Sequence, residues 1–287
     1  MIENQTITEA IQKRYSCRTY TGSAIDPGTR QRLDAFVLEN TKSPFGSRMR
    51  FKLITATPEN TKALKGLGTY GMIKGASGFI IGAVEKAPQD LEDYGYAMEA
   101  IILYATQLGI GTCWLGGTFA KSVFAKKISA GTHETVPAVV ATGNIAPKKR
   151  LTEKIVRWGA RASTRKPWSS LFFHENFETP IESEEAGEYQ TPLEMIRIAP
   201  SASNNQPWRV VRDKTAFHFF LQRTNGYFER NNKYFGMADM QRIDMGIAMC
   251  HFELACRELN LGGEWISRAP DIQITAPQTT YVTSWGV

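Results

Sequence analysis

The sequence contains little of what a membrane-spanning or metal-binding protein needs. No run of 18 apolar residues occurs in its 287 residues, and the most apolar stretches, Gly78–Val84 and Val136–Ala141, have the length of strands. A membrane span is therefore not expected. Cysteine is scarce, and the four residues are Cys17, Cys113, Cys250 and Cys256. They show neither metal-ligand spacing nor a disulfide pattern, which suits a reducing compartment.

Signals for export and for nucleic-acid binding are also missing. Met1–Ala10 is acidic and polar and has no apolar signal core, so a cytoplasmic location is expected. The net charge of +6 could suit nucleic acid, but Lys and Arg are scattered along the chain rather than gathered in one stripe. Gly66–Gly71 fits the pattern G-x-G-x-x-G, but no predicted helix begins there, so the sequence has no dinucleotide-binding fingerprint. With 42% hydrophobic and 22% charged residues, the composition is that of a globular protein.

Helices and strands alternate in the first half of the chain. Thr6 and Glu9 form a capping box that begins a helix through about Lys13. Asp26 and the proline after it are an N-cap and first helical residue, and they begin a second helix toward Glu39. Apolar periodicity then predicts strands at Phe51–Ala56, Gly78–Val84 and Val136–Thr142, and helices at Asp93–Leu108 and Thr118–Ile128.

A long helix and the turn after it occur twice, at a constant offset of 151 residues. The first copies of the seven identical pairs are Gly95, Ala97, Met98, Leu103, Leu108, Gly111 and Trp114. A weaker match sets Ser43–Phe45 against Ala199–Ser201, each before a strand, and the C-terminal Tyr281–Val287 can be paired with Val139–Ile145. The pattern favours an internal duplication. Two unrelated α+β modules that share a helix pattern are the alternative.

The segment between the two copies has its own character. Arg157–Gln190 begins with a basic piece, continues with Trp168, Phe172 and Phe173, and ends in an acidic stretch. We interpret the aromatic piece as an apolar arm and the acidic stretch as an exposed linker. The expected units are therefore copy 1 at residues 1–165, the arm and linker at 166–190, and copy 2 at 191–287.

Three short segments carry candidate chemistry. Arg14, Ser16 and Arg18 alternate in an extended stretch after the first helix, so two guanidinium groups and a hydroxyl can face one phosphate. Taken alone, the spacing also fits an ordinary surface triplet. Pro200–Trp208 combines two prolines with Ser, Asn and Gln, whose donors and acceptors suit a planar heterocycle, although ordinary Asx and ST turns are the alternative. Leu115–Thr118 contains two adjacent glycines that allow a backbone to approach a flat ligand, or that simply connect two elements.

Together these segments resemble the FMN-dependent nitroreductase family. The family's opening basic-basic-x-Ser-x-basic run corresponds to Lys13–Arg18, and its Pro-Ser-x-x-Asn-x-Gln-Pro-Trp pattern is filled at every fixed position by Pro200–Trp208. A Leu-Gly-x-Gly stretch corresponds to Leu108–Gly111, followed by the glycine turn. The resemblance covers nearly the whole chain. It implies an α+β fold with a mixed or mostly antiparallel sheet in two pseudo-symmetric copies.

The two copies depart from the family pattern in complementary ways. Ordinary members are homodimers whose flavin lies between two subunits. Here copy 1 has the opening motif and copy 2 has the full Pro-Ser-Asn-Gln segment, whereas copy 1 has only Ser43–Arg48 at the matching place. No clear second opening motif precedes Thr191, unless Arg161–Arg165 serves. We therefore expect a fused pseudo-dimer that keeps one flavin site and needs no partner chain. Trp168, Phe172 and Phe173 are expected to fill the second site.

The resemblance implies an NADH- or NADPH-driven flavin oxidoreductase that binds FMN and reduces a small-molecule acceptor such as a nitroaromatic or a quinone. It names no catalytic side chain. The implied cofactor-binding residues are Arg14, Tyr15, Ser16, Arg18, Gly116, Gly117, Arg165, Pro200, Ser201, Ala202, Asn204 and Gln206. The alternatives are another flavin reaction, such as dehydrogenation or reductive dehalogenation, and a flavin- or ligand-binding protein without activity.

Overall fold

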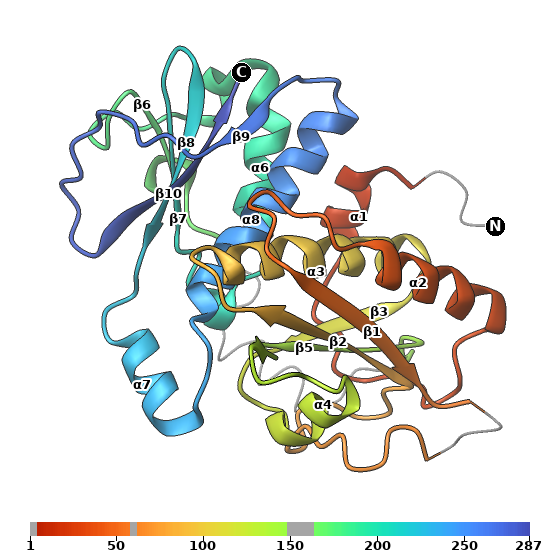
Figure 1. Ribbon diagram of the computed structural model, residues 1–287. Helices are drawn as coiled ribbons and strands as arrows, with labels where there is room; N and C mark the ends of the chain where they lie inside the picture. The colour runs from red at the N-terminus through yellow and green to blue at the C-terminus, as the bar shows by residue number, and fades with distance from the viewer. Residues whose placement is uncertain (1–4, 58–61, 148–163) are drawn as a thin grey trace.

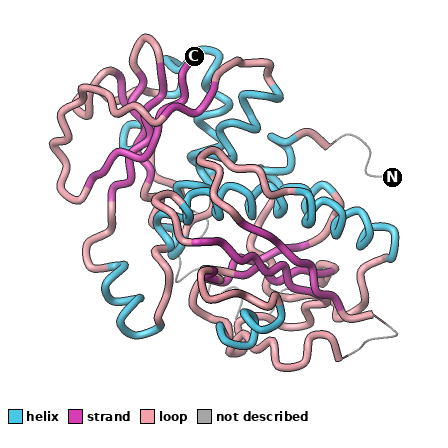
Figure 2. The backbone as a smooth tube through the Cα atoms, viewed as in Figure 1, coloured by secondary structure: helices cyan, strands magenta, loops and turns pink. Residues whose placement is uncertain are grey.

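Two β-sheets lie on either side of a pair of long helices in the computed structural model, which describes residues 5–57, 62–147 and 164–287 (Figures 1 and 2). The arrangement is α+β, as the sequence predicts. Helices α3 and α8 pack against each other between the sheets, and each is also packed on the sheet of its own half.

The first half begins with two capped helices and continues into the first sheet. Its elements are α1 (Ile7–Lys13), α2 (Pro27–Glu39), β1 (Met49–Thr55), β2 (Gly78–Glu85), α3 (Asp90–Gln107), β3 (Gly111–Leu115), α4 (Lys121–Lys127), β4 (Glu134–Thr135) and β5 (Val139–Gly143). The predicted capping box of α1 is present, because Thr6 Oγ1 accepts from the Glu9 backbone and Glu9 accepts from the Thr6 backbone. Asp26 caps α2 by accepting from the Thr29 N–H.

The second half repeats this plan with short additions. Its elements are η1 (Trp168–Ser170), β6 (Phe172–His174), η2 (Ser183–Tyr189), α6 (Gln190–Ile198), η3 (Ala202–Asn204), β7 (Trp208–Arg212), β8 (Ala216–Gln222), α7 (Tyr227–Phe235), α8 (Met240–Glu258), β9 (Glu264–Ile266) and β10 (Thr279–Gly286), where η marks a 3-10 helix. Helix α7 projects away from both sheets (Figure 1).

The strand orders of the two sheets correspond one to one. The first sheet has the order β1-β2-β5-β3, with β4 paired to β2, and the second contains β7-β8-β10-β9 with β6 added beside β7. All pairs are antiparallel except β6–β7. Each half therefore has the same four antiparallel strands, in which the last strand along the chain lies between the second and the third, and a long helix connects the second strand to the third. This is the pseudo-symmetry that the repeat predicts.

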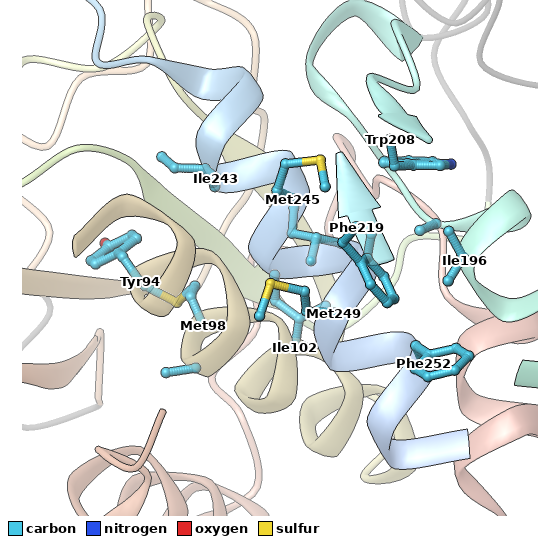
Figure 3. Close-up of a cluster of buried hydrophobic side chains, with 14 of the residues drawn as sticks. Tyr94, Met98, Ile102, Ile196, Trp208, Phe219, Ile243, Met245, Met249 and Phe252 are labelled. Carbon is cyan, nitrogen blue, oxygen red and sulfur yellow. The ribbon is translucent and has the colours of Figure 1, made fainter. Parts of the chain in front are cut away.

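The crossing of α3 and α8 shows the same symmetry at atomic detail. A Cβ on Gly95 would lie 2.2 Å from the Ile243 carbonyl oxygen, and a Cβ on Gly246 would lie 1.9 Å from that of Glu92. These contacts exchange under the offset of 151, since 92 + 151 = 243 and 95 + 151 = 246. The repeated glycines therefore exist because the two helix backbones touch. Further along, apolar side chains of α3 and α8 interleave (Figure 3).

The arm between the copies differs from the prediction. Phe172 lies in β6, which adds a parallel strand to the second sheet, and Trp168 packs edge-on against it at a ring distance of 4.7 Å. The acidic stretch is exposed as expected, but it forms the 3-10 helix η2, with Ala186 and Tyr189 buried. The segment is thus built into the second half and is not a bare linker.

None of the helices in the described ranges could cross a bilayer, because none is both long enough and apolar enough. The four cysteines are buried and free.

Candidate functional site

The opening segment leaves α1 and runs in extended form beside β3. Helix α1 ends at Lys13, and the Cys17 N–H donates to the Thr112 carbonyl at 2.8 Å. Cys17 is buried at this contact, so its neighbours Ser16 and Arg18 face the other way. The extended geometry that the alternating motif required is therefore present.

The Pro-Ser-Asn-Gln segment is a tight loop between α6 and β7 with an unusual backbone. Ser203, Asn204 and Gln206 have φ values of 53°, 55° and 48°, in the left-handed region. Each such non-glycine residue costs on the order of 1–3 kcal/mol and persists only where its surroundings fix it. The fixing contacts are short: Asp244 Oδ1 accepts from the Ala202 N–H at 2.9 Å, and Ser201 Oγ accepts from the Gln206 N–H at 2.9 Å.

These two segments meet at a cavity of about 320 Å³ that is rich in cations. It is lined by Gln12, Lys13, Arg14, Tyr15, Ser16, Arg18, Arg165, Pro200, Ser201, Ser203 and Asn204. Four of these side chains are basic, and none of the described lining residues is acidic. We call this the cationic cavity. Its chemistry is that of a site for a phosphate group.

An adjoining cavity of about 210 Å³ shares Ser16, Arg18, Pro200, Ser201 and Ser203 with the cationic cavity. We call this the ring cavity. The further predicted residues in its lining are Gly116, Gly117 and Ala202. The lining also contains residues that the sequence analysis did not assign to cofactor binding, namely Trp114, Leu115, Thr118, Tyr227, Met237, Met240, Asp244 and Ile247. The two cavities form one continuous site between the halves, with charge at one end and mostly apolar groups at the other.

Gly116 and Gly117 are glycines for a different reason from the approach to a flat ligand that the sequence suggested. A Cβ on Gly117 would lie 2.5 Å from Met237 Sδ, and a Cβ on Gly116 would lie 2.6 Å from Met240 Sδ. Methionines from the second half therefore pack directly on the turn of the first. Lys121 strengthens this contact by donating to the Gly236 carbonyl at the end of α7. The glycines line the ring cavity, but their close neighbours are side chains of the other copy.

Arg14 and Trp114, one residue from each cavity, are held by the buried carboxylate of Glu99. Arg14 Nε lies 3.7 Å from Glu99 Oε1, and Trp114 Nε1 donates to Oε2 at 2.7 Å. Glu99 has no solvent exposure, and His251 Nε2 lies 3.0 Å from its Oε1. The other nitrogen of His251, Nδ1, lies 2.9 Å from the Met195 carbonyl, where only an N–H can donate. A proton must therefore lie between His251 Nε2 and Glu99, and α8 is tied to α3 beneath the site.

Arg165 and Gln206 occupy different positions from each other. Arg165 lines the cationic cavity and donates to the Ile198 carbonyl at 3.0 Å and to Asn204 Oδ1 at 3.3 Å. Gln206 lines neither cavity. It is 3% exposed, and its side chain accepts from the Lys166 N–H at 2.8 Å and donates to the Asn204 carbonyl at 3.2 Å. Gln206 therefore braces the loop from behind, and its contact with the ring stays a prediction.

Asp244 is the acidic residue of the ring cavity and is 1% exposed. Burial raises the pKa of this carboxyl well above its usual range; the Ala202 N–H opposes the shift, and the negative charges of Asp239 and Glu99 add to it. Asp93 is its counterpart at the offset of 151 and accepts from the Phe45 and Ser47 N–H groups at 2.9 and 2.8 Å. The repeated aspartate is a signal that sequence analysis missed.

The raised pKa of Asp244 gives a prediction about stability. Between the unfolded pKa of about 3.9 and the higher folded pKa, the native state binds more protons, so this residue's contribution to stability falls as the pH rises. Asp244→Asn keeps an oxygen for the Ala202 N–H and cannot ionise. The Tm of the variant minus that of the native protein should therefore rise as the pH is raised from 4 to 8 in thermal melts. A difference that does not change with pH would contradict the prediction.

Two expectations concerned the second copy: an alternative opening motif at Arg161–Arg165, and aromatic side chains that fill a second flavin site. Residues 161–163 of the alternative opening motif lie outside the described residues. Trp168 and Phe172 do not fill a second site, because they are buried in the second half, and Trp168 Nε1 donates to Glu194 at 3.0 Å. Phe173 packs against Phe177 at a ring distance of 5.6 Å.

Comparison with known proteins places the fold and the family. A family model described as "Putative TM nitroreductase" matches residues 6–256. The chain is similar to a solved structure described as a putative nitroreductase from Thermotoga maritima, with 20% identity, a TM-score of 0.60, and 98% of this chain and 93% of the other covered. At this identity the likeness shows the fold alone. None of the curated proteins matches the sequence.

Shorter chains match about half of this one. A nitroreductase family protein from Clostridium difficile has 16% identity and a TM-score of 0.41, over 54% of this chain and 92% of its own. A structure from Desulfovibrio desulfuricans, described as a putative nitroreductase in complex with FMN, has 20% identity and a TM-score of 0.39, over 53% of this chain and 95% of its own.

Proposed function

Because the chain belongs to the TM nitroreductase family, whose model matches residues 6–256, we propose that it is an FMN-dependent oxidoreductase that takes electrons from NADH or NADPH and reduces nitroaromatic or quinone-type acceptors. The observation that carries the proposal is the continuous site between the halves, in which a cavity with four basic side chains opens into a mostly apolar one. The name of the Desulfovibrio structure, which includes FMN, supports the same cofactor.

The residues present fit FMN at both of its ends. A phosphate monoester carries nearly two negative charges, and the described residues of the cationic cavity offer Lys13, Arg14, Arg18 and Arg165 with no carboxylate among them. The flat end of the cofactor needs apolar walls and a few polar groups, which Trp114, Ile247 and the Pro200 loop supply. A second phosphate and an adenosine would need a further basic site, for which the lining gives no support.

Each group of residues has a distinct task in this proposal. Arg14, Ser16 and Arg165 hold the phosphate, with Tyr15 beside them, and Arg18, which lines both cavities, also favours negative charge at the near edge of the ring. Pro200, Ser201, Ala202 and Asn204 form a loop whose shape is fixed by Asp244, so the ring is met by a preorganised surface. Met237 and Met240 exclude water beside the glycine turn. When bound, FMN supplies the two-electron chemistry, and the protein supplies binding, orientation and charge.

The hydroxyl pair at the ring cavity is the part of the site that can meet an acceptor. Tyr227 and Ser203 both line this cavity, and their hydroxyl oxygens lie 3.1 Å apart. One hydroxyl donates to the other, which leaves one O–H free to donate to an oxygen of a nitro or quinone group, so these two side chains are proposed to orient the acceptor.

The purified protein is expected to be yellow, or to become yellow with FMN, and to take up one FMN per chain without a partner chain. Flavin fluorescence during titration of the apoprotein gives the stoichiometry, mass spectrometry of the released ligand distinguishes FMN from FAD, and sedimentation at the same concentrations gives the oligomeric state. Two FMN per chain, FAD as the ligand, or binding only in a concentration-dependent dimer would each contradict the proposal.

Activity separates this proposal from its alternatives. Oxidation of NADH or NADPH in the presence of a nitroaromatic and quinone panel supports the reductase, whereas FMN binding without any turnover supports a binding protein. Turnover that requires a different substrate, such as a halogenated aromatic, would indicate another reaction on the same fold.

A further inference from the structure

A separate cavity of about 630 Å³ lies between the halves and shares no lining residue with the cationic cavity or the ring cavity. It is lined by residues of α2, α3 and the Ser43–Pro44 turn from the first half, and by residues of α8, β9 and β10 from the second. We call it the second cavity. It is the place where exchange of the two halves would put another ring cavity.

Three wall residues establish this correspondence. The ring cavity has Trp114 from the first half, and Ile247 and Pro200 from the second. The second cavity has Trp265 from the second half, and Tyr96 and Pro44 from the first. The offset of 151 relates Trp114 to Trp265 and Tyr96 to Ile247, and the repeated turns relate Pro44 to Pro200. The second cavity is therefore the ring cavity with the copies exchanged.

Its walls are aromatic and held in place. Tyr96 and Trp265 both donate to Glu253 Oε2, at 2.7 and 2.6 Å, so one buried carboxylate fixes two walls, much as Glu99 holds Trp114 in the ring cavity. Phe36 and Tyr104 stack at a ring distance of 4.2 Å on another side. Aromatic surfaces with fixed orientations are suited to a flat ring system.

The charge and the hydrogen-bonding groups of the second cavity differ from those of the flavin site. Its described lining contains two basic residues, Lys42 and Arg257, and two acidic ones, Glu253 and Glu264, so it has no excess of cations for a phosphate. Arg257 is paired with Glu253. The indole of Trp285 is 2% exposed and adds a further aromatic wall to the cavity, while its Nε1 atom is buried beside Gly263.

We propose that the second cavity binds a flat, uncharged aromatic molecule between these aromatic walls. Duplication left the ring-binding walls at both places, while the cation cluster that would hold a phosphate is present at one. The correspondence rests on the proposed FMN site, whereas ligand binding to the second cavity can be measured without turnover and can fail separately from it.

Binding of lumichrome tests the proposal. Lumichrome is a neutral, fluorescent tricyclic compound with two carbonyl groups and no phosphate chain. Calorimetric titration into protein saturated with FMN is expected to give one lumichrome per chain. Ala100→Trp places a large side chain in the second cavity from α3 and is expected to weaken binding at least about tenfold, with FMN affinity unchanged. The matched control, Thr118→Trp, obstructs the ring cavity instead and is expected to leave lumichrome binding intact.

The outcomes are distinguishable. Absence of lumichrome binding would overturn the proposal, and so would binding that Thr118→Trp abolishes and Ala100→Trp preserves, since the molecule would then lie at the flavin site. If Ala100→Trp does not fold, Tyr104→Ala decides, because it removes a partly exposed aromatic wall of the cavity. This variant is expected to bind lumichrome about 2- to 12-fold more weakly, which corresponds to one aromatic contact, and an unchanged affinity would overturn the proposal.

Discussion

Gly246→Ala is expected to destabilise the protein by about 3 kcal/mol or more, although alanine is the better helix former by about 1 kcal/mol. The added Cβ would lie 1.9 Å from the Glu92 carbonyl oxygen and 2.7 Å from the Tyr96 backbone nitrogen. Both atoms belong to the backbone of α3, so no side-chain rotation can relieve the overlap, and α3 and α8 must separate. For a chain of this size the Tm should fall by roughly 6–12 °C.

Two further variants make this prediction specific to the helix crossing. Gly95→Ala places a methyl group 2.2 Å from the Ile243 carbonyl on the other side of the pseudo-symmetric contact, and it should have a comparable cost. Gly28→Ala in α2 is the matched control, because its Cβ would meet only Asp26 Oδ2 at an ordinary 3.4 Å. Thermal and urea unfolding would measure all three. A Gly246→Ala protein as stable as the Gly28→Ala protein would show that the helices do not pack as closely as described.

The repeated helix shows how far sequence reasoning can go. Identical residues at one offset are visible without coordinates, so the two long helices and the pseudo-symmetry of the halves could be predicted. Why Gly95 and Gly246 are glycines could not, because the reason is a contact between helices 151 residues apart in the chain. Sequence periodicity reports which face of a helix is buried, and it does not report how closely two backbones approach.

In the site, too, the features within one segment could be predicted from the sequence, and the contacts between distant segments could not. The opening motif and the Pro-Ser-Asn-Gln loop are continuous segments, and the structure brings both to one pair of adjoining cavities. Gln206 lines neither cavity, and its side-chain oxygen accepts from the Lys166 N–H, a contact 40 residues away in the chain that the motif does not reveal. Met237 and Met240 gave no signal of their own, since methionine in an apolar stretch is usually a core residue.

The arm between the copies shows a further limit of prediction from the sequence. Trp168 and Phe172 were correctly recognised as residues that pack on something, but the partner was wrong. Their partner is the edge of the second sheet, where Phe172 pairs in register with Val210. A strand of three residues is too short to give a pattern of alternation, so its pairing could not be predicted from the sequence.

Arg14→Ala is expected to weaken FMN binding by about 1.5–3 kcal/mol, which is roughly a 10- to 150-fold increase in Kd. The reason is the loss of a guanidinium from the cationic cavity, whose described lining has no carboxylate. Titration of the apoprotein with FMN, followed by flavin fluorescence, measures the change. Ser16→Ala, which removes a neutral hydroxyl from the same cavity, is the comparison variant and should cost less, about 0.5–1.5 kcal/mol.

The contact between Arg14 and Glu99 adds a second consequence, which a purely ligand-binding arginine would not have. Arg14→Ala removes a cation 3.7 Å from a carboxylate with no solvent exposure, so the variant should also lose stability without FMN. Adding Glu99→Gln removes the buried charge, and the double variant should recover apoprotein stability relative to Arg14→Ala while its FMN affinity stays low. Glu99→Gln also weakens the hydrogen bond from Trp114, so the single Glu99→Gln variant completes the double-mutant cycle. If the double variant regains FMN affinity together with stability, Arg14 acts only through the fold and does not hold the phosphate.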